Sequence, residues 1–281
     1  MKNIVALLIT IFTIVYSYSQ KNDISNCIEK GDSLFYSYLN FDENPNFTIN
    51  DEQTKGIKKL LKLYYKCLES SNNKDETPLM LYQKMGILHY LIKNNEKAIV
   101  FLKKVFRQAS NPYSKQFVSK ILMNIYLQKN EFDQALGYAN SSFKYTQYSP
   151  CGNAMAEDRL FKAFTYGKIY FGLKKYNKAL DFLLPEIFSN GLVDNRELAV
   201  LTVDVLNKMY NKKEIKRLFD KSLDDIFVIK KDAKDYYYTK ILNVVIPIPD
   251  YKRLVEKDNG KFGLLKKELK KSEIFKLIES N

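Results

Sequence analysis

Three stretches of this chain share one spacing of small, apolar and polar residues, and that spacing constrains the fold more than any other feature. In each stretch two positions lie three residues apart, a polar turn follows, and an alanine comes nine residues after the second position. The alanines are Ala98, Ala135 and Ala179. A small residue that recurs after a polar turn suits a close crossing of two antiparallel helices. The spacing therefore predicts helix–turn–helix units, each with an apolar face that a neighbouring unit covers.

The residues before the turn fit this geometry. A glycine in the first helix, such as Gly86, lets the second helix approach closely, and an aromatic residue one turn later fills the groove between the helices. A fourth, weaker stretch has Val203, Leu206 and Ile215 in the same register. The positions expected to hold the repeats together are Gly86, Ala98, Tyr126, Ala135, Gly167, Tyr170 and Ala179.

This pattern resembles the tetratricopeptide repeat, which carries W-x₂-L-G-x₂-Y, then A-x₃-F, then P over about 34 residues. The third stretch matches best, with Gly167 and Ala179 in the glycine and alanine positions. The second stretch departs most, because Met123 replaces the glycine and Ala139 replaces the phenylalanine. The resemblance covers about residues 77–225. It implies an all-α fold, an α–α superhelix (solenoid) of about four to five antiparallel helix pairs.

The rest of the chain is organised around these repeats. We expect a signal peptide at residues 1–19, a divergent N-terminal helical pair at 20–70, tetratricopeptide-like repeats at 71–233, and a C-terminal connector with capping helices at 234–281. Residues 241–250 are β-branched and interrupted by proline, which predicts an extended connector. The lysine-rich residues after it predict one or two short amphipathic helices that cover the last apolar face.

Several helix boundaries have local signals. Asn111 followed by Pro112 predicts an N-cap and a first helical residue. Asn130 and Asn177 are expected to cap the second helices of their units. Pro185 falls inside an expected helix and should kink or end it.

The N-terminus predicts export. One early lysine precedes an apolar run from Ile4 to Tyr16, which is shorter than the roughly 20 residues that span a bilayer. Small residues at alternate positions then predict cleavage between Ser19 and Gln20, which gives a periplasmic or secreted protein. The alternative is an uncleaved membrane anchor.

The three cysteines are consistent with this compartment, because thiol pairs oxidise outside the cytoplasm. Cys27 lies near the start of one expected helix and Cys67 near the end of the next. Antiparallel neighbours bring such ends together, so we expect either a Cys27–Cys67 disulfide or two buried thiols. Cys151 is left over.

The charge of the chain favours anionic partners. Removing residues 1–19 lowers the net charge from +13 to +12. A strongly basic surface attracts nucleic acid, anionic lipid or anionic polysaccharide, and export argues against nucleic acid. A nucleotide-composition bias toward Lys, Asn, Ile, Tyr and Phe codons would also produce this charge.

The sequence carries no recognisable catalytic site. There is one histidine, His89, and it occupies a repeat position where sister units have Tyr or Leu, which predicts a core residue. No Cys/His cluster has metal-ligand spacing, and no glycine-rich phosphate loop is present. We therefore expect no enzyme activity, no cofactor and no metal.

The resemblance also implies where a partner would bind. Tetratricopeptide-like arrays usually bind in a concave groove lined by the first helices. By register, the groove candidates are Gln83, Tyr90, Lys120, Asn124, Gln128, Phe164, Lys168, Phe171, Asp204, Asn207 and Lys208. We expect a non-enzymatic exported scaffold or adaptor that binds a protein or peptide there. The alternative is a binder of envelope polysaccharide or of an anionic surface, whose binding would fall steeply with salt.

Overall fold

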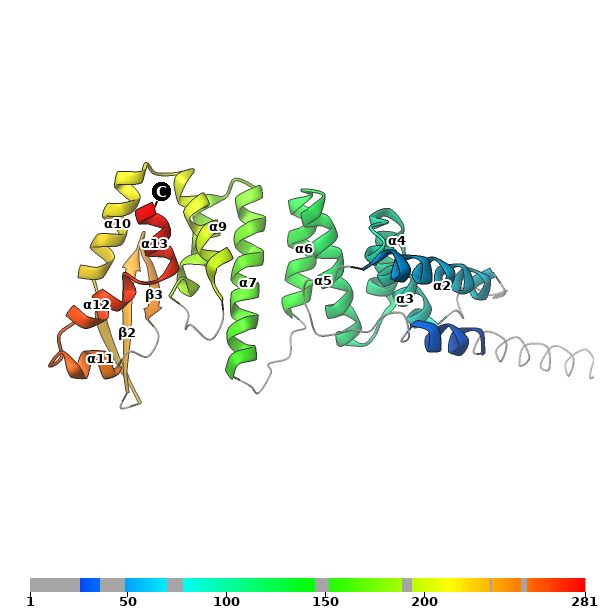
Figure 1. Ribbon diagram of the computed structural model, residues 1–281, viewed down its shortest axis with the longest axis horizontal. Coiled ribbons are helices and arrows are strands. Elements are labelled where there is room, and N and C mark those ends of the chain that lie inside the picture. The colour runs from blue at the N-terminus through cyan, green and yellow to red at the C-terminus, as the bar shows by residue number, and fades with distance from the viewer. Residues whose placement is uncertain are drawn as a thin grey trace, which may run out of the picture. The chain divides into compact units, whose positions relative to one another are not determined.

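The computed structural model describes residues 26–35, 49–69, 78–144, 152–188, 194–232, 234–248 and 252–280. The signal peptide expected at residues 1–19 and Cys151 lie outside these ranges. The described residues are mainly helical and form two compact units, Met1–Ile125 and Tyr126–Asn281 (Figure 1). Each unit is described by itself below. The part of the chain that the structure describes has no helix long and apolar enough to cross a membrane.

The first unit contains a helix at residues 26–35 and the helices α2 (Asp51–Glu69), α3 (Leu79–Leu91) and α4 (Asn95–Gln108). It also holds most of α5 (Pro112–Gln128). Helix α3 packs along α4 and contacts α2. As predicted, Pro112 is the first residue of α5, and the Asn111 side chain accepts a hydrogen bond from the Tyr113 N–H at 2.9 Å.

The second unit begins within α5 and continues with α6 (Phe132–Lys144), α7 (Gly152–Gly172) and α8 (Tyr176–Leu183). The chain leaves α8 through the 3₁₀ turn η1 (Leu184–Glu186), which contains Pro185, so this proline ends the helix as expected. Helix α7 packs against α6, α8 and α9. The helices that follow are α9 (Arg196–Asn207) and α10 (Lys212–Asp224).

A small antiparallel sheet corrects the expectation of an all-α fold. Its strands are β1 (Phe227–Lys231), β2 (Lys234–Ile241) and β3 (Val244–Ile248), in the order β1-β2-β3. The described part of the predicted connector is therefore a hairpin with Ile241 opposite Val244. Leu242 and Asn243 both have positive φ, as the commonest two-residue hairpin turn requires. Neither is glycine, which explains why the sequence pattern did not reveal the turn.

The chain ends in α11 (Lys252–Lys257), α12 (Gly263–Leu269) and α13 (Glu273–Ser280). Helix α13 packs on both α9 and α10, and more extensively on α9 than α10 does. In the fourth expected helix pair, α13 therefore contacts much of the surface of α9 that α10 was expected to cover. One continuous core joins α7–α10, the sheet and these last helices, and it includes Phe219, Tyr237 and Phe275.

Three connections between helices have the same backbone geometry. Lys93, Asn130 and Lys174 each have a positive φ near 60°, and each lies five residues before the repeat alanine. At each turn the amide of this residue donates to the carbonyl three residues back, and the next amide donates five residues back. This pair of bonds is the Schellman motif that closes a helix C-terminus. Asn130 therefore ends α5 and does not cap α6. Asn177 lies inside α8, whose N-cap is Lys175, so both predicted asparagine caps were wrong.

The glycines on the first helices make the close contacts that the repeat predicts. A Cβ atom on Gly86 would lie 2.5 Å from Leu102 Cδ2, and one on Gly167 would lie 2.5 Å from Leu183 Cδ2. Each leucine follows its glycine by sixteen residues and is fully buried. Ala98, Ala135 and Ala179 are fully buried as well. Two separate units thus contain the same glycine–leucine contact, which supports the predicted spacing at the level of atoms.

The second repeat reverses this pairing of sizes. Met123 stands at the glycine position and Ala139 at the leucine position, and both are fully buried. Tyr126 is also buried, and its ring stacks on Tyr138 with centroids 5.6 Å apart. The departures from the repeat pattern thus fall at the two positions that form the glycine–leucine contact in the other repeats.

The helix at residues 26–35 is held to α2 by a disulfide and a polar cluster. Cys27 and Cys67 are bonded, with Cα atoms 5.8 Å apart, which decides between the two alternatives that the sequence left open. Asp32 accepts hydrogen bonds from the Tyr64 hydroxyl, at 3.0 Å, and from the ammonium group of Lys84 in α3. The Lys84 side chain is only 8% exposed. The disulfide is consistent with a protein outside the cytoplasm.

Candidate functional site

The groove candidates of the first unit lie on α3 and α5. Gln83 and Tyr90 are half-buried on α3, and Lys120 and Asn124 are half-buried one turn apart on α5. All four retain partial access to solvent, which a binding surface requires. They are therefore compatible with the predicted role.

In the second unit the groove candidates divide into two kinds. Phe164 and Phe171 are partly buried and pack against the core, and the Lys168 ammonium lies 6.0 Å from the centre of the Phe164 ring. Three candidates are exposed on α9 or at its end, and they are Asp204, Asn207 and Lys208. Gln128 at the end of α5 is exposed as well. The two phenylalanines therefore contribute to packing within the unit.

A repeat position outside the predicted groove set exposes a large apolar side chain on three first helices. Met80 on α3, Phe117 on α5 and Phe161 on α7 each lie eighteen residues before the repeat alanine. They are 51%, 45% and 38% exposed. The repeat register identifies this position in the sequence. It does not show that the side chain there faces solvent, because these largely buried helices carry apolar residues on several faces.

Phe161 lies at the edge of an aromatic cluster formed by α6, α7 and α8. Its ring centroid is 5.9 Å from that of Phe143, which is 5.4 Å from Tyr166. Tyr166 stacks on Phe182 at 4.5 Å and donates a hydrogen bond to Asn140 Oδ1 at 2.7 Å. Burial raises the pKa of the Tyr166 hydroxyl, and so does the nearby Tyr170. Phe161 thus contacts the cluster through the Phe143 ring.

His89 is a core residue, as the repeat register predicted. Its Nε2 atom lies 2.9 Å from the Tyr65 hydroxyl, and its ring stacks on Phe101 with centroids 5.7 Å apart. Its Nδ1 atom is buried and has no hydrogen-bond partner among the described residues. Burial lowers the pKa of the imidazole from 6.5 to about 4, and the positive charge of Lys97 acts in the same direction. The ring is therefore neutral at physiological pH and belongs to the packing of the first unit.

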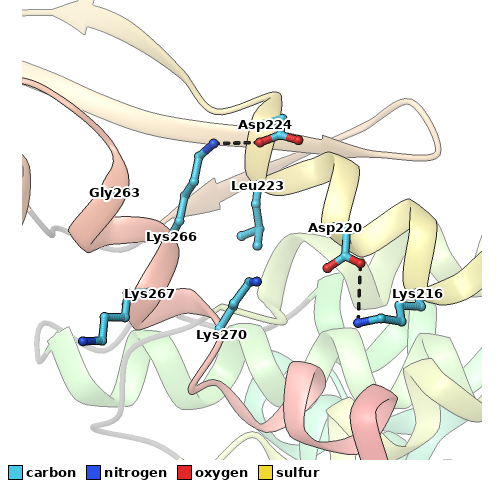
Figure 2. A pocket seen from close by; sticks show the side chains of 8 residues that line it. All are labelled: Lys216, Asp220, Leu223, Asp224, Gly263, Lys266, Lys267 and Lys270. Atoms are coloured by element: carbon cyan, nitrogen blue, oxygen red, sulfur yellow. Dashed lines mark hydrogen bonds and ion pairs between the residues drawn. The ribbon is translucent and has the colours of Figure 1, made fainter.

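A lysine-rich groove lies between α10 and α12 in the second unit, with a volume of about 590 Å³ (Figure 2). Lys266 bonds to Asp224 at 2.7 Å, and Lys216 pairs with Asp220 at 3.5 Å. Lys270 points into the space between these pairs. The lining residues are Lys216, Asp220, Leu223, Asp224, Gly263, Lys266, Lys267 and Lys270. The hydrogen bond from Lys266 is the main reason that the pKa of Asp224 is lowered. Four lysines and two aspartates line the groove, and Figure 2 shows the Lys267 side chain pointing away from the other three lysines.

Within the described ranges, no group of three or more His, Cys, Asp or Glu side chains could hold a metal ion. Comparison with known proteins finds no matching family model and no matching curated protein. The likeness to tetratricopeptide repeats therefore rests on the spacing of residues and on the shared turn geometry.

Proposed function

We propose that this chain is an exported, tetratricopeptide-like helical-repeat protein that binds a protein or peptide partner and catalyses no reaction. The observation that carries the proposal is the exposed apolar side chain at the same position of three repeats, Met80, Phe117 and Phe161. In repeat proteins, equivalent positions of successive repeats commonly serve the same binding role. A scaffold or adaptor of the bacterial envelope fits these features best.

The tetratricopeptide-like superhelix is supported by the geometry within each unit. The three turns share one backbone conformation, and the glycine–leucine contact recurs in α3–α4 and α7–α8. In these two pairs the same turn is followed by the same close contact between the helices. That regularity is what a superhelix of stacked helix pairs needs.

A protein or peptide is the favoured partner because large apolar side chains are costly to leave in water on a monomeric surface. Aromatic and methionine side chains are enriched where proteins bind one another. Phe161 is held by the aromatic cluster around Tyr166, so it would lose little side-chain freedom on binding. Export is supported by the apolar run near the N-terminus and by the Cys27–Cys67 disulfide.

The test is cross-linked affinity purification from intact envelopes of the source cells. The variant Met80→Ser/Phe117→Ser/Phe161→Ser is compared with wild type, and Val100→Ser/Leu264→Ser serves as the matched control because both residues are exposed and apolar but lie elsewhere. We expect one protein to be recovered by the wild type and the control and lost from the triple variant. Equal recovery by all three folded proteins would refute the role of these positions.

A second candidate function, binding of an anionic envelope polysaccharide, is favoured by the groove between α10 and α12. Its four lysines outnumber its two aspartates. Uronic or phosphorylated sugars would pair with Lys266, Lys267 and Lys270. Binding of polygalacturonate should then weaken steeply with salt and be lost when these three lysines are changed to Gln. Salt-independent binding, or binding that the variant retains, would exclude the groove.

A further inference from the structure

The three-stranded sheet has one buried face and one open face. Side chains alternate along each strand, and the register pairs Phe227 with Tyr238, and Tyr238 with Pro247. On the other face Tyr237, Thr239, Ile241, Ile246 and Ile248 are buried against the core of the second unit, whereas Val228, Lys230 and Asp235, toward the β1–β2 hairpin, are exposed. The core of the second unit therefore packs against one face of the sheet.

The open face is apolar at its centre. Alternation and register assign it the side chains of Phe227, Ile229, Lys231, Lys234, Tyr236, Tyr238, Lys240, Val245 and Pro247. Ile229, Tyr236 and Val245 are 45%, 41% and 43% exposed. The solvated face of an antiparallel sheet is ordinarily polar, so an open apolar face of this kind indicates a docking surface.

The charge on this face has a single sign. Lys231 and Lys234 face each other across one hairpin, and Lys240 lies toward the other end of β2. Asp235 lies opposite Lys230 in the strand register, on the other face of the sheet. None of the three lysines on the open face has a carboxylate partner in the part of the chain that the structure describes.

The side chains of the face are also ordered by their neighbours. The Phe227 and Tyr238 rings stack with centroids 5.8 Å apart, and the Lys240 ammonium lies 5.6 Å from the centre of the Phe227 ring. Lysines thus lie at both ends of the face, and the stacked Phe227 and Tyr238 rings lie with aliphatic side chains between them. An occupant must supply negative charge at the edges and tolerate apolar side chains in the middle.

We propose that this face docks on the surface of an anionic lipid bilayer. Tyr and Phe side chains favour the boundary between headgroups and acyl chains, and lysines beside them pair with anionic headgroups. A plane of headgroups meets lysines at both ends of the face at once, while the aliphatic side chains enter the boundary. A protein that supplied acidic groups at both edges would match the lysines as well, and it is the outcome that the polyglutamate arm of the test detects. The inference is independent of the proposed repeat partner.

The chain has no tryptophan, so Tyr236→Trp provides a single fluorescent reporter on the face. The protein is mixed with vesicles of phosphatidylglycerol and phosphatidylcholine, or of phosphatidylcholine alone. We expect a blue shift of the emission with the anionic vesicles only, and weaker binding at higher salt. Tyr113→Trp on α5 is the matched reporter, because Tyr113 is 56% exposed in the other unit, and its emission should not shift.

Charge reversal tests the lysines. In the Tyr236→Trp background, Lys231→Glu/Lys234→Glu/Lys240→Glu should weaken vesicle binding at least about a hundredfold. The control Lys208→Glu/Lys212→Glu/Lys213→Glu makes the same change in net charge on exposed or partly exposed positions and should weaken binding much less. Far-UV circular dichroism confirms that each variant is folded.

Four outcomes would overturn the proposal, and the first three are the following. The emission of the Tyr236→Trp reporter does not respond to anionic vesicles, the two charge reversals weaken binding equally, or the Tyr113→Trp reporter shifts as much as the Tyr236→Trp reporter. A blue shift with soluble polyglutamate but not with vesicles would overturn it in favour of an acidic protein partner.

Discussion

The first helix pair and the regular repeats bring two helices together by different means. In α3–α4 and α7–α8 a turn of three residues, 92–94 or 173–175, connects the helices. The helix at residues 26–35 and α2 are separated in sequence by residues 36–50. Both kinds of pair seat a glycine under a large side chain, and Gly31 lies against the Tyr64 ring as Gly86 lies against Leu102. Among the described residues only the first pair has a disulfide, and its Asp32 and Tyr64 form a polar cluster with Lys84 of α3.

The comparison shows what the tight turn contributes. A Schellman turn fixes the second helix beside the first at a small entropic cost, whereas a longer connection costs more to close. A covalent bond near the helix ends removes that cost from the folding equilibrium. The disulfide in the first pair therefore has the role that three turn residues have in each repeat.

The largest expected effect is on the disulfide. Cys27→Ala/Cys67→Ala should lower the free energy of unfolding of the first helix pair by about 4 kcal/mol, because the bond closes a loop of 40 residues. Hydrogen exchange should speed up in α2 and stay unchanged in α7–α8. Equal loss of protection in α7–α8 would contradict the contrast between the two kinds of pair.

The polar cluster should give the next largest effect. Asp32→Ala leaves the Lys84 ammonium buried without its carboxylate, which should cost about 3 kcal/mol in urea unfolding. Lys84→Met should cost much less, because Asp32 is a quarter exposed and keeps the bond from Tyr64. A smaller loss for Asp32→Ala than for Lys84→Met would show that the cluster is not a buried ion pair.

The glycine contacts test whether the repeats are equivalent. Gly86→Ala and Gly167→Ala each force a Cβ atom against a fully buried leucine, so each should destabilise by about 2 kcal/mol. Gly137→Ala is the matched control, since its Cβ would meet nothing within 4 Å, and it should stabilise α6 by about 1 kcal/mol. Adding Leu183→Ala to Gly167→Ala should cost less than the two single changes summed.

The smallest effect concerns His89. Its folded pKa of about 4 lies below the unfolded value of 6.5, so the unfolded chain binds the proton more readily as the pH falls. The free energy of unfolding should therefore be nearly constant well above pH 6.5 and decrease as the pH falls from 6.5 toward 4. His89→Leu should remove about 1 kcal/mol of this decrease at pH 6. If wild type and His89→Leu show the same pH dependence of the free energy of unfolding in urea melts, the ring is not held neutral.

Much of the repeat region was predictable because its constraints are local. The spacing around Ala98, Ala135 and Ala179 indicated the helix pairs, and Pro112 and Pro185 indicated boundaries. The sheet was not predictable, because the turn at Leu242 and Asn243 lacks glycine. The asparagine caps failed because the Schellman turn places Asn130 at a helix end, where a left-handed residue is needed.

The candidate site was harder to predict than the fold. The register identified the first helices, but Phe164 and Phe171 pack against their own unit while Phe117 and Phe161 are exposed. Both sets lie on helices whose other faces are apolar too. Whether an apolar residue of such a helix faces solvent depends on the neighbouring helices, and sequence periodicity within one helix does not contain that information.

The disulfide also bears on how the chain matures. In an exported chain that crosses the membrane N-terminus first, Cys27 and Cys67 emerge before Cys151. The oxidant therefore meets two thiols before the third arrives, and the order of emergence alone favours the native pair. Production in a reducing cytoplasm would remove this sequence of events and leave three thiols to compete during later oxidation. For an exported chain, the compartment in which the thiols are oxidised would therefore influence whether Cys27 pairs with Cys67.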